Sequence, residues 1–348
     1  MLKRIIHITP SNSPHVVSLV NSLLSSDYDK FDNRIIIYGD CEKNAESEIK
    51  SSVTKPDFVY FCANCFSLIL LILKLNCRKV VCHGDSYAMR TMPLLLGCKE
   101  TWVCWGAYTT LSGSLLSYIS YPYKFVINHL QKHIVALMLS DKEDLEKTYH
   151  LNNVIVLPYP SHQYEQIAPL GLFDMPIHSP LRVLIGNSGH CAPWYRESLT
   201  LLSRYKDKIE VHCMFQYPQL PEAMSNLSKF GSSIFGNNFY LDTKFLNKDE
   251  YYDYLASYDV YVCPKPTQSG LGAIHISLML GKKVYLTGKN LEWERYLGTK
   301  VFDIECIRIE DYGSFSKELS SEDKLSNREH IANHWNRVAE WIGLYKSL

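Results

Sequence analysis

Two glycine-containing segments in the second half of the chain have the composition of phosphate-binding turns. The first, Gly186-Asn187-Ser188-Gly189, directly follows the strand expected at 182–185, and the second, Gln268-Ser269-Gly270-Leu271-Gly272, follows the strand expected at 260–262. A glycine turn between a buried strand and a helix lets backbone N–H groups approach a phosphate, and the helix N-terminus favours its negative charge. The alternative for either turn alone is a tight loop that needs glycine only for its dihedral angles.

The two turns lie about 85 residues apart, and each is placed where an expected strand leads into an expected helix. Turns of this kind gather at the carboxyl edge of a parallel sheet, so together they are expected to hold a diphosphate and its sugar. Lys265 and Arg295 are candidate cations for the leaving diphosphate, and Tyr217 is a candidate for shaping the nucleotide pocket. A bulky residue at Gly186 or Gly270 is expected to weaken nucleotide binding without unfolding the protein.

Three residues in the first half are candidates for acid–base or positioning roles. His83 and Asp85 end an expected strand, where a carboxylate could orient an acceptor hydroxyl or act as a base. His15 lies in the first strand–helix connection. The alternatives are helix capping for Asp85 and a structural role for each histidine. No nucleophile is evident, so catalysis would rest on positioning and on stabilising the departing diphosphate.

The strands and helices that position these residues are predicted from the sequence pattern. Short apolar runs alternate with longer amphipathic segments, which is typical of βα units around parallel sheets. Strands are expected at 4–8, 34–38, 58–61, 79–83, 101–104, 134–139, 154–157, 182–185, 210–214, 260–262 and 283–286. Helices are expected at 14–24, 66–75, 142–149, 194–204, 220–229, 249–257, 272–280 and 327–344, with Asp141 as the N-cap of the third.

The length of 348 residues suits two domains of about 150–180 residues each. The segment 161–180 breaks the alternation with three prolines and a glycine, and is expected to be the linker. We therefore expect an acceptor domain at 1–165 and a donor domain at 180–325, both Rossmann-like α/β folds facing a cleft. The last segment, 326–348, is expected to pack back towards the first domain.

Charge and composition limit the function classes. The formal net charge is zero, which argues against a nucleic-acid binder with a broad basic surface. One Cys-x-x-Cys pair occurs, at Cys62 and Cys65, but a zinc site needs a second pair and none follows, so we expect neither a metal nor a cofactor. The alternative to two inert cysteines at this pair is a thioredoxin-like role. Many of the cysteines lie inside apolar runs, which suits a reducing cytoplasm and predicts a cytoplasmic protein. The start of the chain lacks the apolar core of a secretory signal and is expected to be a buried strand. Aromatic residues and lysines in 115–132 suit a membrane headgroup surface, although buried helix packing explains them nearly as well.

The segment 270–284 resembles the glycine-bounded helix of two-domain, GT-B type glycosyltransferases that use nucleotide sugars. In that pattern an acidic residue normally precedes the first glycine and another lies in the middle of the helix. This chain has Ser269 and Ser277 at those places. The resemblance therefore supports the architecture, while the usual carboxylate contacts to sugar and ribose are missing.

A narrower resemblance rests on several motifs in the same order along the chain. They are Pro14-His15, His83-Gly84, Trp102-Val103-Cys104-Trp105-Gly106, Leu184-Ile185-Gly186-Asn187-Ser188-Gly189, Gln216-Tyr217-Pro218 and Gln268-Ser269-Gly270-Leu271-Gly272. The chain is similar to the bacterial TDP-4-acetamido-4,6-dideoxygalactose (TDP-Fuc4NAc) lipid II transferases, which build the enterobacterial common antigen. The similarity is distant and extends from about Ile6 to Tyr296.

This resemblance implies a metal-independent transferase at the cytoplasmic membrane face, with a TDP-sugar donor, a polyprenyl-diphosphate-linked acceptor and retention of configuration. It also implies that Trp105, Gly106 and Tyr108 contact the acceptor. The chain departs from the family at His190 and after Ala107, where aspartates are usual, and at Asp85, where an amide is expected. A related transferase of surface polysaccharide or O-antigen synthesis is therefore also consistent.

Two other functions remain open from the sequence. A nucleotide-sugar epimerase shares the two-domain fold, but it would need carboxylates near the sugar, and Ser269 and Ser277 count against that. A non-catalytic binding or assembly protein of the same fold is the third class, and the missing aspartate near Tyr108 is consistent with it. Turnover with a nucleotide sugar would separate this last class from both enzymes.

Overall fold

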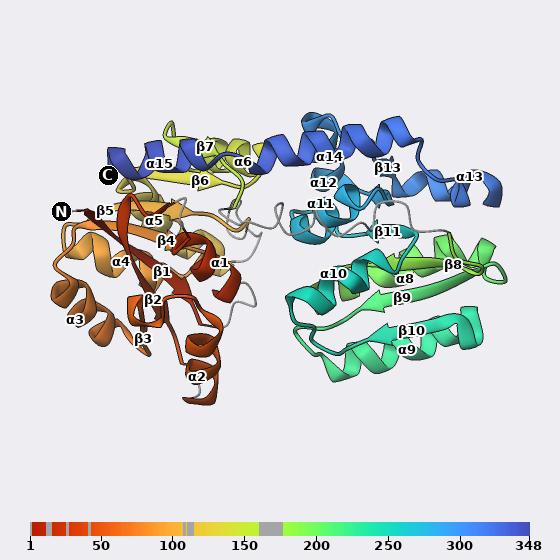
Figure 1. Cartoon of the computed structure of the whole chain (residues 1–348), viewed down its shortest axis with the longest axis horizontal. Helices are drawn as coiled ribbons and strands as arrows, with labels where there is room; N and C mark the ends of the chain where they lie inside the picture. Colours follow the sequence, from red (N-terminus) through yellow and green to blue (C-terminus); the bar gives the residue numbers. More distant parts are fainter. Residues whose placement is uncertain are drawn as a thin grey trace. The chain divides into compact units, whose positions relative to one another are not determined.

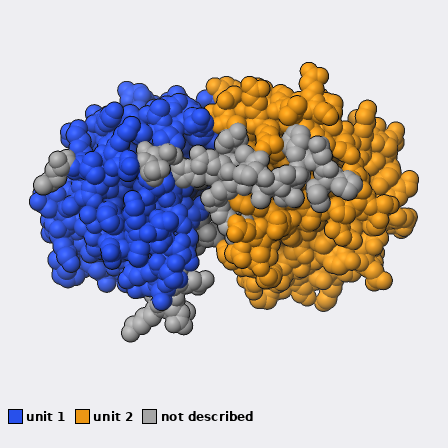
Figure 2. All heavy atoms as spheres, in the orientation of Figure 1, with its two compact units in different colours: residues 1–162, 335–348 blue, residues 163–334 orange. Residues whose placement is uncertain are grey.

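The computed structural model describes residues 2–11, 16–25, 28–40, 43–106, 109, 115–159 and 177–348. The chain divides into two compact units (Figure 2). Unit 1 consists of residues 1–162 together with 335–348, and unit 2 consists of residues 163–334. The expected linker at 161–180 lies outside the described residues as far as residue 176.

Unit 1 is built on a seven-stranded sheet in the order β3-β2-β1-β4-β5-β6-β7, and every pair of neighbouring strands is parallel (Figure 1). The strands are β1 (Lys3–Pro10), β2 (Phe31–Tyr38), β3 (Val59–Cys62), β4 (Lys79–His83), β5 (Lys99–Val103), β6 (His133–Ala136) and β7 (Val154–Val156). Their central residues are mostly β-branched and buried, as is usual for parallel strands covered on both faces.

Helices cover both faces of this sheet. They are α1 (Val16–Leu23), α2 (Lys43–Ser52), α3 (Cys65–Leu75), α4 (Tyr87–Leu95), α5 (Leu115–His129), α6 (Leu139–Tyr149) and the C-terminal α15 (Val338–Ser347). Because side chains alternate along a strand, Ile5 packs with α1 and α15 on one face, while Ile6 packs with α3 and α4 on the other. In α15, Trp341 is buried and its indole Nε1 donates to the carbonyl oxygen of Pro158 over 3.0 Å.

Unit 2 contains a six-stranded parallel sheet in the order β10-β9-β8-β11-β12-β13. The strands are β8 (Leu181–Ile185), β9 (Ile209–Met214), β10 (Phe239–Asp242), β11 (Val260–Cys263), β12 (Lys283–Leu286) and β13 (Phe302–Asp303). The helices are α8 (Ala192–Leu202), α9 (Pro221–Phe235), α10 (Lys248–Ala256), α11 (Leu271–Met279), α12 (Gly288–Leu297), α13 (Tyr312–Ser316) and α14 (Ser321–Trp335). Residues of α8 and α9 share one hydrophobic core with the sheet, and α11 packs on β11 and β12.

Several sequence expectations need correction. Asp141 is not an N-cap, because helix α6 begins earlier, after the extended residue Met138, and Asp141 falls in its first turn. The single helix expected at 327–344 is two helices, α14 and α15, since the first packs in unit 2 and the second in unit 1. Strand β10 was missed, because it has only four residues and lies half-exposed at the sheet edge.

Candidate nucleotide-sugar site

The order of strands in unit 2 creates a switch point between β8 and β11. From β8 the chain proceeds to β9 and β10 on one side, and it later returns to β11, which pairs with β8 on the other side. Ligands of open parallel sheets bind outside the carboxyl ends of the strands at such a point. Both glycine turns leave the sheet here, since one follows β8 and the other follows β11.

The turn after β8 is shaped by close packing around its two glycines. Gly186 has a φ of +72° and donates its N–H to the carbonyl oxygen of Val262 over 2.8 Å. A Cβ atom at this position would overlap the buried ring of Tyr195, lying 2.5 Å from its Cε1 and closer still to its hydroxyl oxygen. Gly189 donates its N–H to the carbonyl oxygen of Tyr217 over 2.8 Å. The loop after β9 therefore supports this turn.

The turn after β11 is held in place by Asn290, a fully buried residue of α12. Its Nδ2 group lies 3.1 Å from the carbonyl oxygen of Ser269 and 3.4 Å from that of Lys265, while its Oδ1 accepts the N–H of Ser269 over 3.4 Å. Gly288 approaches Pro266 so closely that a Cβ atom would lie 2.9 Å from the Cα of Pro266. Asn290 and Gly288 were not identified from the sequence, because their role depends on a contact between distant segments.

The two turns meet through Asn187. The Ser269 hydroxyl donates to Asn187 Oδ1 over 3.0 Å, and the Cys191 thiol donates to the same oxygen over 3.0 Å. The Asn187 amide is oriented with Oδ1 towards both of these groups, so its Nδ2 group points elsewhere. This group has no hydrogen-bond acceptor among the described residues. It remains as a donor at the switch point.

Helix α11 adds backbone donors at the same place. Gly270 is its N-cap with a left-handed backbone, at φ +64° and ψ +23°, and the first intrahelical bond runs from the N–H of Ile274 to the carbonyl oxygen of Gly270. The N–H groups of Leu271, Gly272 and Ala273 precede that bond, so the helix itself does not satisfy them. With Asn187 Nδ2, these groups can bind an anion such as a diphosphate.

The other donor-site candidates are arranged around these turns. The Lys265 ammonium lies 5.9 Å from the ring centroid of Trp194, and the Tyr217 ring contacts Phe245 edge to face. Burial raises the pKa of Tyr217. Arg295 is exposed in the last turn of α12, about two turns from the strand ends, so it is not brought to the site.

Two buried amide atoms near this edge have no hydrogen-bond partner among the described residues. They are Nε2 of Gln216, a residue only 6% exposed that follows β9, and Oε1 of Gln268. An unsatisfied buried polar atom costs about 1–3 kcal/mol, which a bound ligand with matching groups would recover. Gln216 was missed as a site candidate, although the motif Gln216-Tyr217-Pro218 pointed to its loop.

In unit 1, the carboxyl ends of β4 and β5 bring Asp85 next to Trp105. The backbone N–H of Trp105 donates to Asp85 Oδ1 over 3.4 Å, and the backbone N–H of Gly84 donates to the carbonyl oxygen of Val103 over 2.9 Å. The Trp105 ring lies against Gly84, where a Cβ atom would come within 3.2 Å of it. Gly106 follows directly at φ +84°. His15 and Tyr108 lie outside the described residues.

His83 is buried beneath this end of the sheet in a chain of hydrogen bonds. Asn33 donates through Nδ2 to the carbonyl oxygens of Leu23 and Tyr28, so its Oδ1 accepts from His7 Nε2 over 3.2 Å. His7 Nδ1 must then accept from His83 Nε2 over 3.1 Å, which leaves His83 Nδ1 unprotonated.

Burial lowers the pKa of His7 to about 4 and holds the pKa of His83 well below its usual value. Both rings are therefore neutral near neutral pH and have no exposed surface. Of the proposed catalytic residues that the structure describes, Asp85 is the one with exposed surface.

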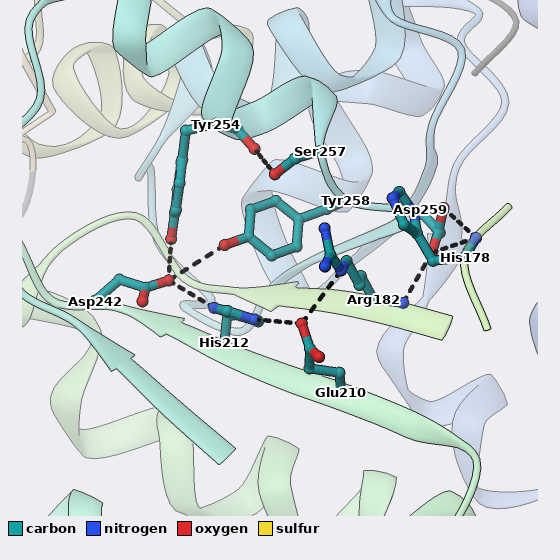
Figure 3. Close-up of polar contacts among 9 residues, drawn as sticks. All are labelled: His178, Arg182, Glu210, His212, Asp242, Tyr254, Ser257, Tyr258 and Asp259. Atoms are coloured by element: carbon teal, nitrogen blue, oxygen red, sulfur yellow. Dashed lines mark hydrogen bonds and ion pairs between the residues drawn. The ribbon is translucent and has the colours of Figure 1, made fainter. Parts of the chain in front are cut away.

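A separate polar cluster lies on one face of the unit 2 sheet (Figure 3). His212 bonds Asp242 through Nδ1 and Glu210 through Nε2, each over 2.9 Å, and the Tyr254 hydroxyl donates to Asp242 over 2.6 Å. Burial disfavours a charged His212, but its two carboxylate partners outweigh that effect and raise its pKa. Because β8, β9, β10 and α10 meet here, the cluster ties α10 to the sheet.

Replacing His212 by glutamine is expected to lower the free energy of unfolding by about 2 kcal/mol below about pH 6.5. The folded protein holds the His212 proton more tightly than the unfolded chain does. Its stabilisation is therefore fully present below the unfolded pKa and is lost as pH rises through the folded pKa. Urea unfolding at a series of pH values checks this, with His330→Gln on the exposed surface of α14 as the control. A loss that grows with pH would contradict the assignment.

Comparison with known proteins shows which fold these two units form. No family model matches the chain. A glycosyltransferase from Rickettsia africae ESF-5 superposes with a TM-score of 0.75 at 14% identity, covering 99% of this chain and 98% of that one. The UDP-GlcNAc 2-epimerase from Neisseria meningitidis bound to UDP-GlcNAc gives a TM-score of 0.58 at 12% identity, with 98% and 99% coverage.

MurG from Acinetobacter baumannii gives a TM-score of 0.54 at 10% identity and covers 99% of this chain and 100% of that chain. The fold is of the GT-B type. These similarities extend over nearly the whole length of the chain, so they include both units of the GT-B fold. At such low identity they establish the fold, and the function has to be argued from the site.

Proposed function

We propose that this GT-B protein is a glycosyltransferase that takes a sugar from a nucleoside-diphosphate sugar. The observation that carries the proposal is the contact of Ser269 with Asn187 Oδ1, which joins the two glycine turns at the switch point of unit 2. It leaves the Asn187 amide and the first N–H groups of α11 as donors for one diphosphate.

In the proposed reaction, the bond between the sugar's anomeric carbon and the diphosphate oxygen breaks, and the acceptor hydroxyl oxygen bonds to that carbon. The diphosphate keeps the electron pair, and donors that already point at it stabilise the added charge. Lys265 is the nearby cation proposed to contribute. Asp85 is proposed to orient the acceptor hydroxyl and take its proton. The buried, neutral His83 supports the end of β4 that carries Asp85.

The finer identity of the substrates is proposed from the motif resemblance. It favours a TDP-linked dideoxyaminosugar such as TDP-Fuc4NAc and a polyprenyl-diphosphate-linked acceptor in surface polysaccharide synthesis, with retention of configuration. Trp105, Gly106 and Tyr108 are proposed to contact the acceptor, and peripheral binding to the membrane is part of the same proposal. Among the described residues, no helix is long and apolar enough to span a bilayer.

A nucleotide-sugar epimerase is the second candidate, because UDP-GlcNAc 2-epimerases also share the fold. The site gives it less support, since Ser269 and Ser277 stand where that chemistry would need carboxylates. Ser277 is 1% exposed within α11, so it does not face a ligand in this structure. Product analysis separates the two activities, because an epimerase converts the nucleotide sugar without an acceptor.

Thermal unfolding in the presence of TDP, UDP, GDP or CMP tests the donor site. A nucleotide at about 100 times its dissociation constant stabilises the native state by about 2.7 kcal/mol, which raises the melting temperature of a domain of this size by roughly 5 °C or more. A selective shift with TDP is the expected result. A shift with UDP or GDP would keep the donor site and change the base, whereas no shift with any nucleotide would favour a non-catalytic protein.

A further inference from the structure

Three helices lie next to one another on one face of the unit 1 sheet: α3, α4 and α5 (Figure 1). Helix α4 packs beside α3, and it contacts α5 through a hydrogen bond between the hydroxyls of Thr91 and Tyr123. The Arg90 guanidinium on α4 also donates to Asn128 on α5 over 2.5 Å, and both of these side chains are buried. The outer surfaces of the three helices therefore form one continuous face, which we call the α3–α5 face.

Large apolar side chains cover this face. Eleven of the nineteen exposed large hydrophobic side chains in the described part of the chain belong to it: Phe66, Leu70, Leu73, Leu95, Leu115, Leu116, Tyr118, Ile119, Tyr123, Val126 and Leu130. The exposed fraction is 71% for Phe66, 77% for Leu116 and 66% for Ile119. A surface helix in water normally presents polar residues on its outer side, and a contiguous apolar patch indicates an interaction surface.

The spacing of these residues shows that they form stripes along the helices. On α3 the exposed residues Phe66, Leu70 and Leu73 follow one another after four and three positions. On α5 the steps from Leu116 through Ile119, Tyr123 and Val126 to Leu130 are three, four, three and four. Residues at such spacing lie along one side of a helix. Both stripes are on the sides that face away from the sheet.

The α5 residues that the sequence suggested for a membrane surface differ in part from the exposed residues of the apolar stripe. Lys124 is only 6% exposed, and Tyr121 and Phe125 pack against the core that contains Trp102 and Tyr149. The inward side of α5 therefore explains much of its mixture of aromatic residues and lysine. The outward stripe is a separate feature, which became evident only when burial was known.

The charged residues on the three helices themselves have one sign. Helices α3, α4 and α5 contain no aspartate or glutamate, although the chain as a whole has equal numbers of acidic and basic residues. Exposed basic residues lie in the last turn of α3, at Lys74, and after the helix ends, at Arg78, Lys99 and Lys132. Burial together with the nearby charges of Lys3 and Lys99 lowers the pKa of Lys79, which indicates how closely lysines gather at this edge.

The distribution of apolar and charged residues on the α3–α5 face distinguishes a protein partner from a lipid bilayer. Protein interfaces that use apolar helix stripes usually carry charges of both signs beside the stripe. A bilayer surface with anionic headgroups favours apolar residues, aromatic residues near the headgroups and basic residues without acidic ones. We propose that the α3–α5 face docks on an anionic phospholipid bilayer, with Leu116, Ile119 and Phe66 inserted among the acyl chains.

This inference rests on the peripheral membrane binding proposed above and names the surface responsible for it. It is tested on the full chain without any nucleotide. Co-sedimentation with vesicles of phosphatidylcholine is compared with vesicles that contain one part phosphatidylglycerol to three parts phosphatidylcholine. We expect strong binding to the anionic vesicles, weaker binding to the neutral ones, and a decrease as salt is added. Ile119→Glu and Phe66→Glu are each expected to reduce the partition coefficient about tenfold or more.

The control is Leu325→Glu, because Leu325 is 58% exposed on α14, which belongs to unit 2 and is not one of the three helices of this face. It is expected to bind vesicles like the unchanged protein, and circular dichroism confirms that all variants are folded. Absence of vesicle binding at low salt, or equal binding by the Ile119→Glu and Phe66→Glu variants, would overturn the proposal. A dimer in sedimentation equilibrium that Ile119→Glu dissociates would assign the face to a second copy instead. Nucleotide binding is measured separately, so the donor site can fail without affecting this result.

Discussion

Alanine at position 186 is expected to destabilise unit 2 by roughly 3–5 kcal/mol, which is a large part of the stability of an average domain. The added Cβ atom would overlap the Tyr195 ring, which is fully buried, so the ring can move only by displacing packed neighbours. Moving Tyr195 would also break the hydrogen bonds from its hydroxyl to the carbonyl oxygens of Ser188 and Met214. Urea unfolding followed by circular dichroism measures the loss.

The matched control is Gly97→Ala. Gly97 has a φ of +70°, close to the +72° of Gly186, but the nearest atom to an added Cβ is 3.9 Å away. This variant carries only the backbone strain of alanine at positive φ, about 1–2 kcal/mol. A second check uses Tyr195→Leu, in which Gly186→Ala should cost much less because the overlapping atoms are gone. If both glycine variants lose the same stability, steric overlap is not the cause.

Alanine at position 270 is expected to reduce nucleotide affinity by about a hundredfold while the protein remains folded. Its Cβ would lie 2.9 Å from Asn187 Cγ and 3.1 Å from Oδ1, so it would push Asn187 away from Ser269. That movement removes the amide donor and disturbs the N-terminus of α11 together. Titration calorimetry with the nucleotide that stabilises the protein best measures the affinity.

Gly97→Ala again supplies the control, since it has similar backbone strain in unit 1 and should leave nucleotide affinity unchanged. Asn187→Ala is a second variant at the site itself, because it removes the amide donor without adding backbone strain. It is expected to lower the affinity in the same direction as Gly270→Ala. If both site variants bind nucleotide as well as the unchanged protein does, the diphosphate is not held at the β8–β11 switch point.

The contrast between positions 186 and 270 shows what glycine patterns in a sequence can and cannot predict. Both were expected to tolerate bulky residues without unfolding. The structure distinguishes them, because a Cβ at Gly186 would meet a buried ring, whereas one at Gly270 would meet the Asn187 side chain at the edge of the site. The sequence identifies both glycines because each follows an expected strand. It does not show which side chain an added Cβ atom would contact.

The sequence by itself determined the α/β class, the parallel strands and the two turns. These properties depend on local patterns: β-branched runs such as Ile35-Ile36-Ile37 form buried strands, and glycine follows them where the backbone must turn. Only the tertiary structure decided which residues meet. Asn187 and Ser269 are 82 positions apart and come together because β8 and β11 pair at the switch point.

Burial was likewise decided by tertiary packing. His83 was a candidate for acid–base chemistry, but pairing of β4 with β1 places it beside His7 inside the sheet, where a proton would be costly. From the sequence, the aromatic residues and lysines of 115–132 were consistent with either a membrane surface or buried helix packing. On α3 and on α5, other apolar residues already supply the side that faces the sheet. Each helix has more apolar surface than the sheet can cover. The apolar residues that stay exposed can be identified only once the packing of the helix on the sheet is known.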